Sequence, residues 1–333
     1  MPEKIYPVKD MEFWKKKKVL VTGATGFLGS WLVQDLLSKG AEVTTIIRDT
    51  TPSSNFFILG LHKKVNIVMG TIVDIALVTR TINEYSIDTI FHLAAQSQVS
   101  ISNKSPLSTF ETNIKGTWVI LEAARELNVE RIIVASSDKA YGPQAVLPYV
   151  ESSPLGGTHP YDVSKSCVDL IARSYFSTYQ LPVVVIRASN LYGGGDNNYA
   201  RLIPKTIKHI LNNESPIIQR SNGTPIRDFL YISDSVRGYI SVAENMDNPD
   251  LVGQAFNIGS GKGMNIKDVV EIIIKQMNSN LTPVIVGESK LVGEINTQYL
   301  SSEKILKILG WKPEYSFEDG LAETINWYEN NLS

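Results

Sequence analysis

Short apolar runs alternate with helical patterns through the first half of the chain. This alternation is typical of an α/β fold with a doubly wound parallel sheet covered by helices. The predicted strands are Val19–Thr22, Val43–Ile47, Val65–Val68, Thr89–Leu93, Arg131–Ala135 and Val183–Arg187. The predicted helices begin near Phe27, Ile75, Pro106, Tyr161 and Leu202. Gly116, within the helix after Pro106, predicts a close neighbour at that position.

The second half of the chain follows a weaker pattern. Beyond Arg187 glycines and prolines become denser, as in Gly193-Gly194-Gly195. Helical patterns resume over Ile266–Met277 and Ser302–Leu309. We therefore expect a larger domain over residues 16–187, to which the chain returns around 228–260. Residues 188–333 are expected to form mainly a smaller, substrate-binding lobe, with a small-molecule site between the two lobes.

Composition narrows the class of protein. The 333 residues carry a formal net charge of −2 at pH 7, and no basic face for a nucleic acid stands out. No apolar run approaches the roughly 20 residues needed to cross a bilayer. Cys167 is the only cysteine, so an internal disulfide is excluded. We expect a cytoplasmic protein without a nucleic-acid or membrane partner, and no residue spacing indicates a metal site.

A glycine-rich turn follows the first predicted strand. The segment Gly23-Ala24-Thr25-Gly26-Phe27-Leu28-Gly29 opens a helix and precedes a second strand. Its glycines permit a tight turn and let backbone N–H groups approach a pyrophosphate at the helix N-terminus. The segment predicts a Rossmann-type dinucleotide-binding domain. Its expected cofactor contacts are Gly23, Thr25, Gly26, Phe27, Leu28 and Gly29.

The end of the second predicted strand is expected to contact the cofactor ribose. An acidic residue there binds the 2′-hydroxyl of NAD. This chain has Arg48 followed by Asp49. Arg48 suits adenine stacking or the 2′-phosphate of NADP, whereas Asp49 suits the ribose of NAD. NAD is the first expectation, and NADP is the alternative.

Three side chains suit alcohol oxidation. Tyr161 and Lys165 lie four residues apart, so they share one face of a helix. An ammonium group beside a phenol favours the phenolate, which lowers the pKa of the tyrosine and gives a base usable near neutral pH. Ser137 is a candidate to hydrogen-bond the same reacting oxygen. Such a triad beside a dinucleotide removes a proton from an alcohol while hydride leaves its carbon.

Together the motifs resemble the extended short-chain dehydrogenase/reductases, and within them the nucleotide-sugar epimerases and dehydratases. The resemblance covers residues 16–330. It rests on the glycine turn, the Tyr161/Lys165 pair, His92-Leu93-Ala94-Ala95, Asn113-Ile114-Lys115-Gly116-Thr117, Asn190-Leu191-Tyr192-Gly193 and Arg227-Asp228-Phe229. One family feature is missing, because Thr71 stands where the family usually has the acid that approaches adenine.

The resemblance implies further site residues. Cofactor contacts are implied for Asp74, Leu93, Ala94, Ala95, Asn113, Tyr161 and Lys165. Substrate contacts are implied for Gln96, Ser97, Asn190, Arg201 and Arg227, with Arg227 the main partner of a pyrophosphate. Simpler roles stay open, because Arg227 can pair with Asp228 and Asn190 can cap a turn. His92 is expected to be a core histidine.

The segment Ser136-Ser137-Asp138-Lys139 indicates which type of enzyme within that group the chain resembles. Sugar 4-epimerases usually carry small or apolar residues at the positions of Asp138 and Lys139, whereas Ser-Asp-Lys is similar to CDP-glucose 4,6-dehydratases. The resemblance implies a lyase that oxidises C4 of a nucleotide-bound hexose, eliminates water across C5 and C6, and returns hydride to C6.

Each step of that reaction has an implied residue. Tyr161 takes the O4 proton, and Ser137 hydrogen-bonds O4. Lys165 lowers the pKa of Tyr161 and binds the nicotinamide ribose. Asp138 protonates the leaving C6 hydroxyl, while Lys139 removes the C5 proton or holds a group that does. A lysine base must be neutral when it acts, so its pKa has to be depressed.

Two other functions remain open. A NAD(P)-dependent C4 epimerase uses the same scaffold but needs neither an acid at C6 nor a base at C5. A non-catalytic, dinucleotide-sensing protein tends to lose the Tyr/Lys pair. We also expect a homodimer, because the helix from Val163 to Phe176 is apolar enough on both faces for packing against a second subunit.

Overall fold

The computed structural model describes residues 12–219, 224–286 and 295–331. At its centre is a seven-stranded parallel sheet in the order β10-β6-β5-β4-β1-β2-β3. The strands are β1 Lys18–Thr22, β2 Glu42–Ile47, β3 Asn66–Met69, β4 Thr89–His92, β5 Arg131–Ala135, β6 Val183–Ala188 and β10 Ala255–Ile258. Six of them are the predicted strands, shifted by no more than one residue at either end. The predicted doubly wound α/β fold is confirmed.

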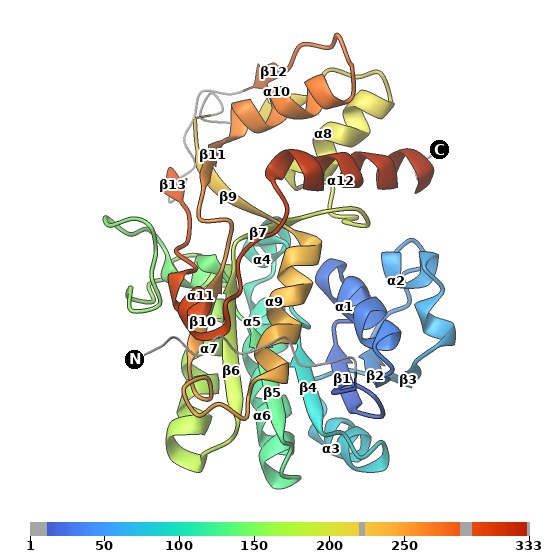
Figure 1. The fold of residues 1–333 in the computed structure, drawn as a ribbon, viewed down its shortest axis with the longest axis vertical. Coiled ribbons are helices and arrows are strands. Elements are labelled where there is room, and N and C mark those ends of the chain that lie inside the picture. Colours follow the sequence, from blue (N-terminus) through green and yellow to red (C-terminus); the bar gives the residue numbers. More distant parts are fainter. Residues whose placement is uncertain (1–11, 220–223, 287–294, 332–333) are drawn as a thin grey trace.

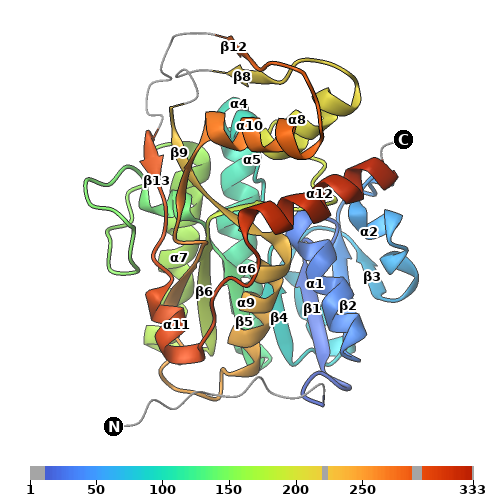
Figure 2. The same ribbon diagram turned by 45° about the horizontal axis from the view of Figure 1, so that its top comes forward.

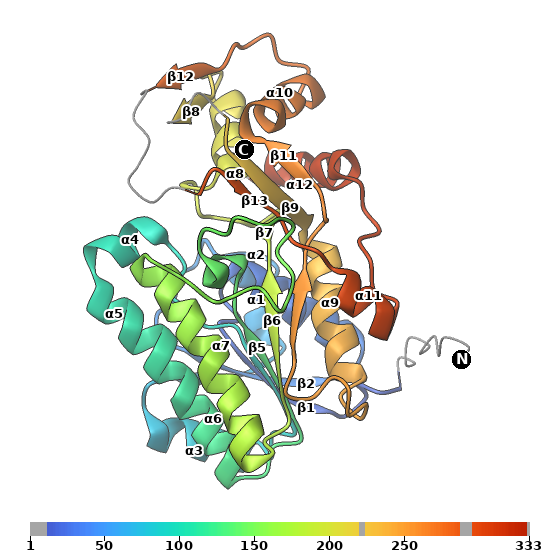
Figure 3. The ribbon, with the colours of Figure 1, turned by 90° about the vertical axis from the view of Figure 1, so that its left-hand side faces the viewer.

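Helices cover both faces of this sheet (Figures 1 and 3). One face carries α1 Phe27–Ser38 and α9 Ile232–Glu244, and the other carries α3 Ile75–Glu84, α6 Gly116–Glu126 and α7 Pro160–Tyr179. Within β1, Val19 and Val21 pack into the core beneath α1 and α9, whereas Leu20 packs into the core beneath the other three. Successive side chains of a strand point to opposite faces, so a strand covered on both sides is apolar throughout.

The helix predicted from Pro106 is interrupted. It consists of α5 Pro106–Phe110, a π-helical turn Glu111–Lys115, and α6. A short helix, α4 Val99–Lys104, precedes it and was not predicted. The expected close neighbour of Gly116 is confirmed, because a Cβ there would lie 2.5 Å from Cδ1 of Ile72.

The smaller lobe is built on a second sheet (Figure 2). Strands β11 Gly263–Asn265, β9 Ile226–Tyr231 and β13 Thr297–Gln298 lie side by side, and β7 Asn190–Tyr192 also pairs with β9. A separate pair is formed by β8 Ile217–Gln219 and β12 Val284–Val286. Helices α8 Leu202–Leu211, α10 Ile266–Gln276 and α12 Phe317–Asn331 belong to this lobe, and its core includes Ile207, Ile273 and Tyr328.

The chain crosses between the two lobes more than once. After β9 it returns to the main sheet as α9 and β10, and α11 Glu303–Leu309 later packs beside β10. Remaining short elements are α2 Asn55–Ile58, a 3₁₀ turn Leu61–Lys63, and η3 Asp138–Tyr141. In the described parts of the chain, no helix combines the length and apolar character needed to cross a membrane.

Candidate active site

The predicted site residues gather at the carboxyl edge of the main sheet. The glycine turn follows β1, residues 93–97 follow β4, and η3 follows β5. The sheet reverses its winding between β1 and β4, because β2 and β3 lie on one side of β1 and β4, β5 and β6 on the other. In open α/β sheets, ligands bind outside the carboxyl ends of the strands at such a switch point.

The backbone of the glycine turn fits a dinucleotide. Gly23 has a φ of +77°, and a Cβ there would lie 2.7 Å from the backbone nitrogen of Ala94. A Cβ at Gly29 would lie 2.1 Å from the carbonyl oxygen of Gly23. Gly26 caps α1 without a side-chain hydrogen bond, and the first turn of α1 contains no acidic residue. The helix N-terminus therefore carries no anion of its own, as a bound pyrophosphate requires.

The side chains of the turn anchor it to the protein. The ring of Phe27 lies against Gly193, where a Cβ would be 3.3 Å from its Cζ atom. Leu28 packs against the core beneath α1 and α9, and Thr25 is half-buried. With the side chains of Phe27 and Leu28 packed against the protein, the backbone of the turn is the part expected to contact a cofactor.

The chain after β4 lies against the glycine turn. The N–H of Leu93 donates to Thr22 O at 3.2 Å, and that of Ala94 donates to Thr22 Oγ1 at 3.3 Å. Like these two residues, Ala95 is half-buried. Residues 93–95 and the glycine turn are thus joined at the ends of adjacent strands, where the cofactor is expected.

Asn113 supports this loop from the π-helical turn. Its Oδ1 accepts from Gln96 N at 2.7 Å, and its Nδ2 donates to Gln96 O at 3.1 Å. Nδ2 also donates to Ser164 Oγ at 2.9 Å, beside Lys165. The expected contact of Asn113 with the cofactor stays a prediction, because these bonds explain the residue as a tie between the loop after β4 and α7.

Two further cofactor candidates have local partners. At the end of β2, Arg48 Nε donates to Asp49 Oδ2 at 2.6 Å, and both side chains are exposed. Asp74 caps α3 by accepting from Leu77 N at 3.1 Å. The contacts predicted for Arg48 and Asp74 with the cofactor therefore also stay predictions.

The turn after β5 carries three candidate catalytic side chains. Ser137 caps η3 by accepting from Lys139 N at 3.2 Å, and its hydroxyl donates to Asp138 Oδ1 at 3.0 Å. The Nζ of Lys139 lies 3.4 Å from Asp138 Oδ2. Burial lowers the pKa of Lys139, and the charge of Arg227 acts in the same direction against Asp138 and Asp162. This favours the neutral amine that a lysine base requires.

Tyr161 and Lys165 lie on α7, which packs against η3. Lys165 Nζ donates to Ala135 O at 2.7 Å, and burial lowers the pKa of this lysine to about 8. Burial raises the pKa of Tyr161 to about 12, while its hydrogen bond with Ser137 opposes this shift. The pKa of Tyr161 is thus raised in this structure, because burial of the phenol outweighs its hydrogen bond with Ser137 and the charge of Arg201. The lowering effect expected of Lys165 stays a prediction.

Asp162 is a site residue that the sequence analysis missed. Its side chain is buried in the first turn of α7, beside Tyr161. Burial raises the pKa of its carboxyl group to about 6, against the opposing charges of Lys139 and His159. Its position directly after Tyr161 was the available signal, but nothing in the sequence showed that the side chain would be buried beside Lys139.

Arg227 and Asn190 lie on paired strands of the smaller lobe. Asn190 Nδ2 donates to Asp228 O at 3.0 Å, which joins β7 to β9. The guanidinium of Arg227 donates to Ile226 O at 2.9 Å, and its charge acts on Lys139. Asp228 accepts from Ser260 Oγ at 2.6 Å and from Leu300 N at 3.2 Å. Arg227 is therefore close enough to the catalytic turn to belong to one site with it.

The other substrate candidates differ in their surroundings. Arg201 donates to the buried Asp196 at 3.0 Å, and its charge lowers the pKa of Tyr161. Gln96 Oε1 accepts from Gln98 N at 3.0 Å, whereas Ser97 is exposed. Arg201 is thus brought into the electrostatic range of Tyr161, and Gln96 and Ser97 lie in the loop after β4.

Gln298 is a second missed residue, and it comes from the far end of the chain. It ends β13 and is fully buried. Its Nε2 donates to Asp138 O at 2.8 Å, and its Oε1 accepts from Lys139 Nζ. The smaller lobe therefore contacts the catalytic turn directly. Sequence spacing gives no signal for a contact of this range.

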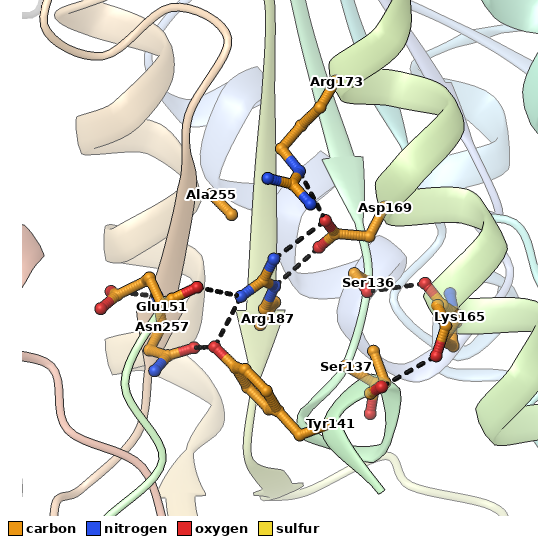
Figure 4. A network of polar contacts seen from close by, with 12 residues as sticks. Ser136, Ser137, Tyr141, Glu151, Lys165, Asp169, Arg173, Arg187, Ala255 and Asn257 are labelled. Carbon is orange, nitrogen blue, oxygen red and sulfur yellow. Dashed lines mark hydrogen bonds and ion pairs between the residues drawn. The ribbon is translucent and has the colours of Figure 1, made fainter. Parts of the chain in front are cut away.

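A buried network of hydrogen bonds and ion pairs connects the catalytic turn η3 to α7 and β6 (Figure 4). Arg187 of β6 pairs with Asp169 of α7 through two hydrogen bonds, of 2.6 and 2.9 Å. The same guanidinium donates to the hydroxyl of Tyr141 at 2.8 Å, which in turn donates to Asn257 Oδ1 at 2.6 Å. Arg173 also pairs with Asp169, at 2.9 Å. One arginine thus joins η3, α7 and β6.

His92 is a core histidine, as predicted. It is buried, and its two ring nitrogens lie 2.8 Å from Thr22 Oγ1 and 3.0 Å from Thr117 Oγ1. Burial lowers its pKa to about 3, so the ring is neutral. Among the described residues, no group of three or more His, Cys, Asp or Glu side chains is arranged to hold a metal ion.

Comparison with known proteins covers nearly the whole chain. The family model described as GDP-mannose 4,6 dehydratase matches residues 20–324. CDP-glucose 4,6-dehydratase of Salmonella typhimurium is 32% identical, over 96% of this chain and 92% of that protein. dTDP-D-glucose 4,6-dehydratase of Homo sapiens is 31% identical, over 95% of this chain and 91% of that protein.

Solved structures of both reaction types are similar to the fold. The UDP-glucose 4-epimerase of Thermotoga maritima with UDP-glucose has a TM-score of 0.86 and 28% identity, over 95% of this chain and 99% of that one. A dTDP-glucose 4,6-dehydratase of Streptomyces venezuelae with NAD bound has a TM-score of 0.84 and 30% identity, over 94% of this chain and 97% of that one. Overall structural similarity therefore does not distinguish a dehydratase from an epimerase. That distinction has to come from the side chains of the site.

Proposed function

The chain belongs to the GDP-mannose 4,6-dehydratase family, and we propose that within it this protein is an NAD-dependent nucleotide-sugar 4,6-dehydratase acting on CDP-glucose. The observation that carries the proposal is the burial of Asp138 and the partial burial of Lys139 beside Ser137, in a turn packed on the helix of Tyr161. Epimerisation at C4 uses neither an acid at C6 nor a base at C5. Dehydration uses both, so the position of the two side chains supports dehydration.

The first step is oxidation at C4. Tyr161 takes the O4 proton as hydride leaves C4, and its hydrogen bond with Ser137 and the charge of Arg201 favour the phenolate against the effect of burial. Ser137 is proposed to bind the same substrate oxygen. Lys165 holds its ammonium at the end of β5, where it contacts the ribose of a dinucleotide in our proposal. The cofactor, when bound, supplies a reversible store for one hydride.

The second step is loss of water. The C4 ketone acidifies the proton on C5, and the neutral amine of Lys139 takes it. Asp138 gives a proton to the C6 hydroxyl, the C6–O bond breaks, and a C5–C6 double bond forms as water leaves. Hydride then adds to C6, and Lys139 returns its proton to C5. Tyr161 ends with a proton and Asp138 without one, so exchange with solvent resets both.

The proposed substrate contacts lie around this turn. Arg227 is proposed to bind the pyrophosphate, and Arg201 and Asn190 the phosphate or sugar, since cationic and amide groups are suited to those oxygens. Gln96 and Ser97 are proposed to face the sugar or the nicotinamide. CDP-glucose is proposed as the substrate because the Ser137-Asp138-Lys139 segment resembles the enzymes that act on it, and the Salmonella relative carries that activity in its name.

The protein is proposed to be a cytoplasmic homodimer. Leu107 of α5, Trp118 of α6 and Leu170 of α7 are 72%, 44% and 54% exposed. The helices that carry them lie side by side on one face of the molecule (Figure 3). Exposed apolar side chains on packed helices of one face suit a self-complementary interface. The free thiol of Cys167 suits a reducing compartment.

Mass spectrometry of reaction products tests the function. The protein is incubated with CDP-glucose, GDP-mannose, dTDP-glucose and UDP-glucose, each with NAD and with NADP. We expect a product lighter by one water from CDP-glucose with NAD. The same loss from another nucleotide sugar would keep the reaction and correct the substrate.

A C4 epimerase is the second candidate, and the similarity to the Thermotoga epimerase favours it. Epimerisation leaves the mass of the sugar unchanged, so samples without water loss are separated by chromatography. An epimer without any dehydrated product would replace our proposal. Unchanged sugar in every combination would contradict both functions for this panel.

A further inference from the structure

Gln298 is a buried polar side chain that the proposed reaction does not use. Both hydrogen bonds of its amide go to the catalytic turn, one to the carbonyl oxygen of Asp138 and one to Nζ of Lys139. No part of its surface is exposed. A buried polar group is stable only when it is paired, so these bonds explain why a glutamine can occupy this position.

The chemistry of the two partners fixes the orientation of the amide. The carbonyl of Asp138 can only accept a hydrogen bond, and the protonated amine of Lys139 can only donate one. Gln298 satisfies both only with its nitrogen toward the carbonyl and its oxygen toward the amine. A glutamate at the position cannot donate to the carbonyl, and a leucine of similar size can bind neither group.

The strand that carries Gln298 is anchored on two sides. β13 pairs with β9 so that Gln298 stands opposite Arg227. Two residues later, Leu300 N donates to the buried carboxylate of Asp228 at 3.2 Å. Leu300 also forms a parallel bridge with Tyr149, in the loop that follows η3. The amide is therefore held by backbone pairing and not by its own two bonds alone.

Charged groups face Lys139 from each neighbouring element. Asp138 lies on its own turn, Asp162 on α7 and Arg227 on β9, and together with burial they determine how readily the amine is protonated. Gln298 is neutral, and its oxygen is in direct contact with the amine. Replacing the amide of Gln298 therefore changes a group in direct contact with the amine of Lys139, while Asp138, Asp162 and Arg227 stay in place.

We propose that Gln298 is a positioning residue for Lys139, holding the amine where it exchanges the C5 proton and tying that step to the smaller lobe. The inference rests on the proposed function, which identifies the step as proton exchange at C5 by Lys139. Its consequence is that β9 and β13 carry two linked contacts, Arg227 for the pyrophosphate and Gln298 for the base. Water loss then depends on a strand pair outside the main sheet, whereas C4 oxidation does not.

A titration of Lys139 tests the contact without any substrate. Lysine labelled at Cε with ¹³C is followed by NMR in the wild-type protein, with the signal assigned from Lys139→Met. Gln298→Glu places a carboxylate at the amine, so we expect the pKa of Lys139 to rise by about one unit or more. Gln298→Leu removes the acceptor of the charged form, so we expect the pKa to fall. An unchanged titration in both variants would overturn the inference, whether or not the enzyme is active.

Partial reactions test the consequence for catalysis. With CDP-glucose in D₂O, reduced cofactor reports oxidation at C4, and deuterium at C5 reports proton exchange by Lys139. For Gln298→Leu we expect C5 exchange to fall by about 10- to 100-fold with C4 oxidation within about twofold, since misplacing a catalytic group by 1 Å costs about that much. For Gln298→Glu we expect the pH dependence of exchange to move upward. A variant that loses both steps equally, with no change in pH dependence, would show a merely structural role.

Gln254 provides a control on the surface of the protein. Its Oε1 accepts from Nζ of Lys304 at 3.0 Å, so it makes the same type of contact away from the site. Gln254→Leu should leave both partial reactions and the titration of Lys139 unchanged. If the wild-type protein fails to dehydrate every nucleotide sugar, the proposed function fails, while the substrate-free titration still decides the contact of Gln298 with Lys139.

Discussion

At the scale of the residue, the site holds a partly buried lysine, Lys139, near a buried carboxyl group, that of Asp162. Burial lowers the pKa of Lys139 and raises the pKa of Asp162 to about 6. Each group is thereby pushed toward its neutral form. Pairs whose environments shift their pKa values in this way are typical of acid–base sites.

Replacing Asp138 or Lys139 should separate oxidation at C4 from the loss of water. In Asp138→Asn and Lys139→Met, reduced cofactor should still form from CDP-glucose, while water loss falls by at least about 100-fold, the usual contribution of one proton-transfer group. Absorbance of the reduced cofactor and product mass measure the two halves. Tyr161→Phe is the control and should abolish both. Full dehydration by Asp138→Asn and Lys139→Met would remove their assigned roles.

Asp162 should make stability depend on pH. Its folded pKa of about 6 lies above the ordinary value of 3.8, so the folded state binds more protons between these two values. The stability that its protonated form contributes is present below pH 3.8 and is lost as the pH rises through about 6. Asp162→Asn has no charge to lose, so it should gain stability relative to the wild type between pH 4 and 7, by up to about 3 kcal/mol.

Urea unfolding at several pH values measures this difference. The free energies of unfolding of wild type and Asp162→Asn should diverge as the pH is raised. Parallel curves would mean that Asp162 is as well solvated in the folded protein as in the unfolded chain.

Several residues of the site could be predicted from the sequence because their partners are local. The glycine turn and the Tyr161/Lys165 pair depend on spacings of a few residues within one element. Gln298 could not be found in this way, because its contact with Lys139 joins two distant parts of the chain. The raised pKa of Tyr161 also escaped prediction, because it results from burial and the sequence shows only neighbouring charges.

At the scale of the element, the catalytic turn depends on a buried arginine. Arg187 and Asp169 are 1% and 0% exposed, and they connect β6 and α7 to Tyr141 of η3. Charges buried to this extent are tolerated only when they are paired and hydrogen-bonded. The network therefore holds in place the two elements that carry the candidate catalytic residues.

Arg187→Met should be strongly destabilising because it leaves Asp169 buried with fewer partners. Breaking one side of a buried pair typically costs about 3–5 kcal/mol in the free energy of unfolding. Tyr141→Phe loses only hydrogen bonds and should cost about 1 kcal/mol. The double variant Arg187→Met with Asp169→Asn should recover part of the loss. Chemical denaturation measures all three, and a cost for Arg187→Met no larger than that for Tyr141→Phe would contradict the buried-pair account.

The strands and most longer helices of the first half were predictable from their apolar patterns and turn residues, whereas the short helices α2 and α4 were not. The later elements were harder. α9 follows β9 without any loop between Tyr231 and Ile232. No turn residue therefore marks where the alternating pattern of the strand changes to the helical pattern. α12 contains Glu318, Asp319 and several amides, and its buried stripe is narrow. Within the π-helical turn, Asn113 accepts a hydrogen bond from the loop after β4, and no local pattern encodes this contact.

At the scale of the whole molecule, α5, α6 and α7 each carry an exposed apolar side chain on the same face. The proposed homodimer would cover them. The change in pattern after Arg187 predicts a second, smaller lobe, and the domain bounds drawn from it stay a prediction. The sequence predicted that the chain returns to the larger domain around residues 228–260. It did not predict that α11 also lies against the main sheet.

Leu170→Glu should shift the protein toward monomer. A carboxylate in the middle of an apolar interface loses its hydration without gaining a partner. Light scattering after gel filtration at micromolar concentration measures the mass. Leu306→Glu is the matched control, because Leu306 is a similarly exposed leucine on α11. A wild-type protein that is already monomeric, or equal masses for both variants, would contradict the proposed interface.

The position of β10 has a consequence for how the protein is made. The main sheet ends in a strand formed by residues 255–258 of 333, and this strand covers the edge of β6. During synthesis on a ribosome, β6 emerges long before its outer neighbour exists. Its Val-Val-Val-Ile sequence is then an unpaired, apolar edge, which is the kind of strand that aggregates. The nascent chain therefore passes through a stage in which chaperone protection of β6 matters most, and a chain stopped before residue 255 should accumulate in the insoluble fraction.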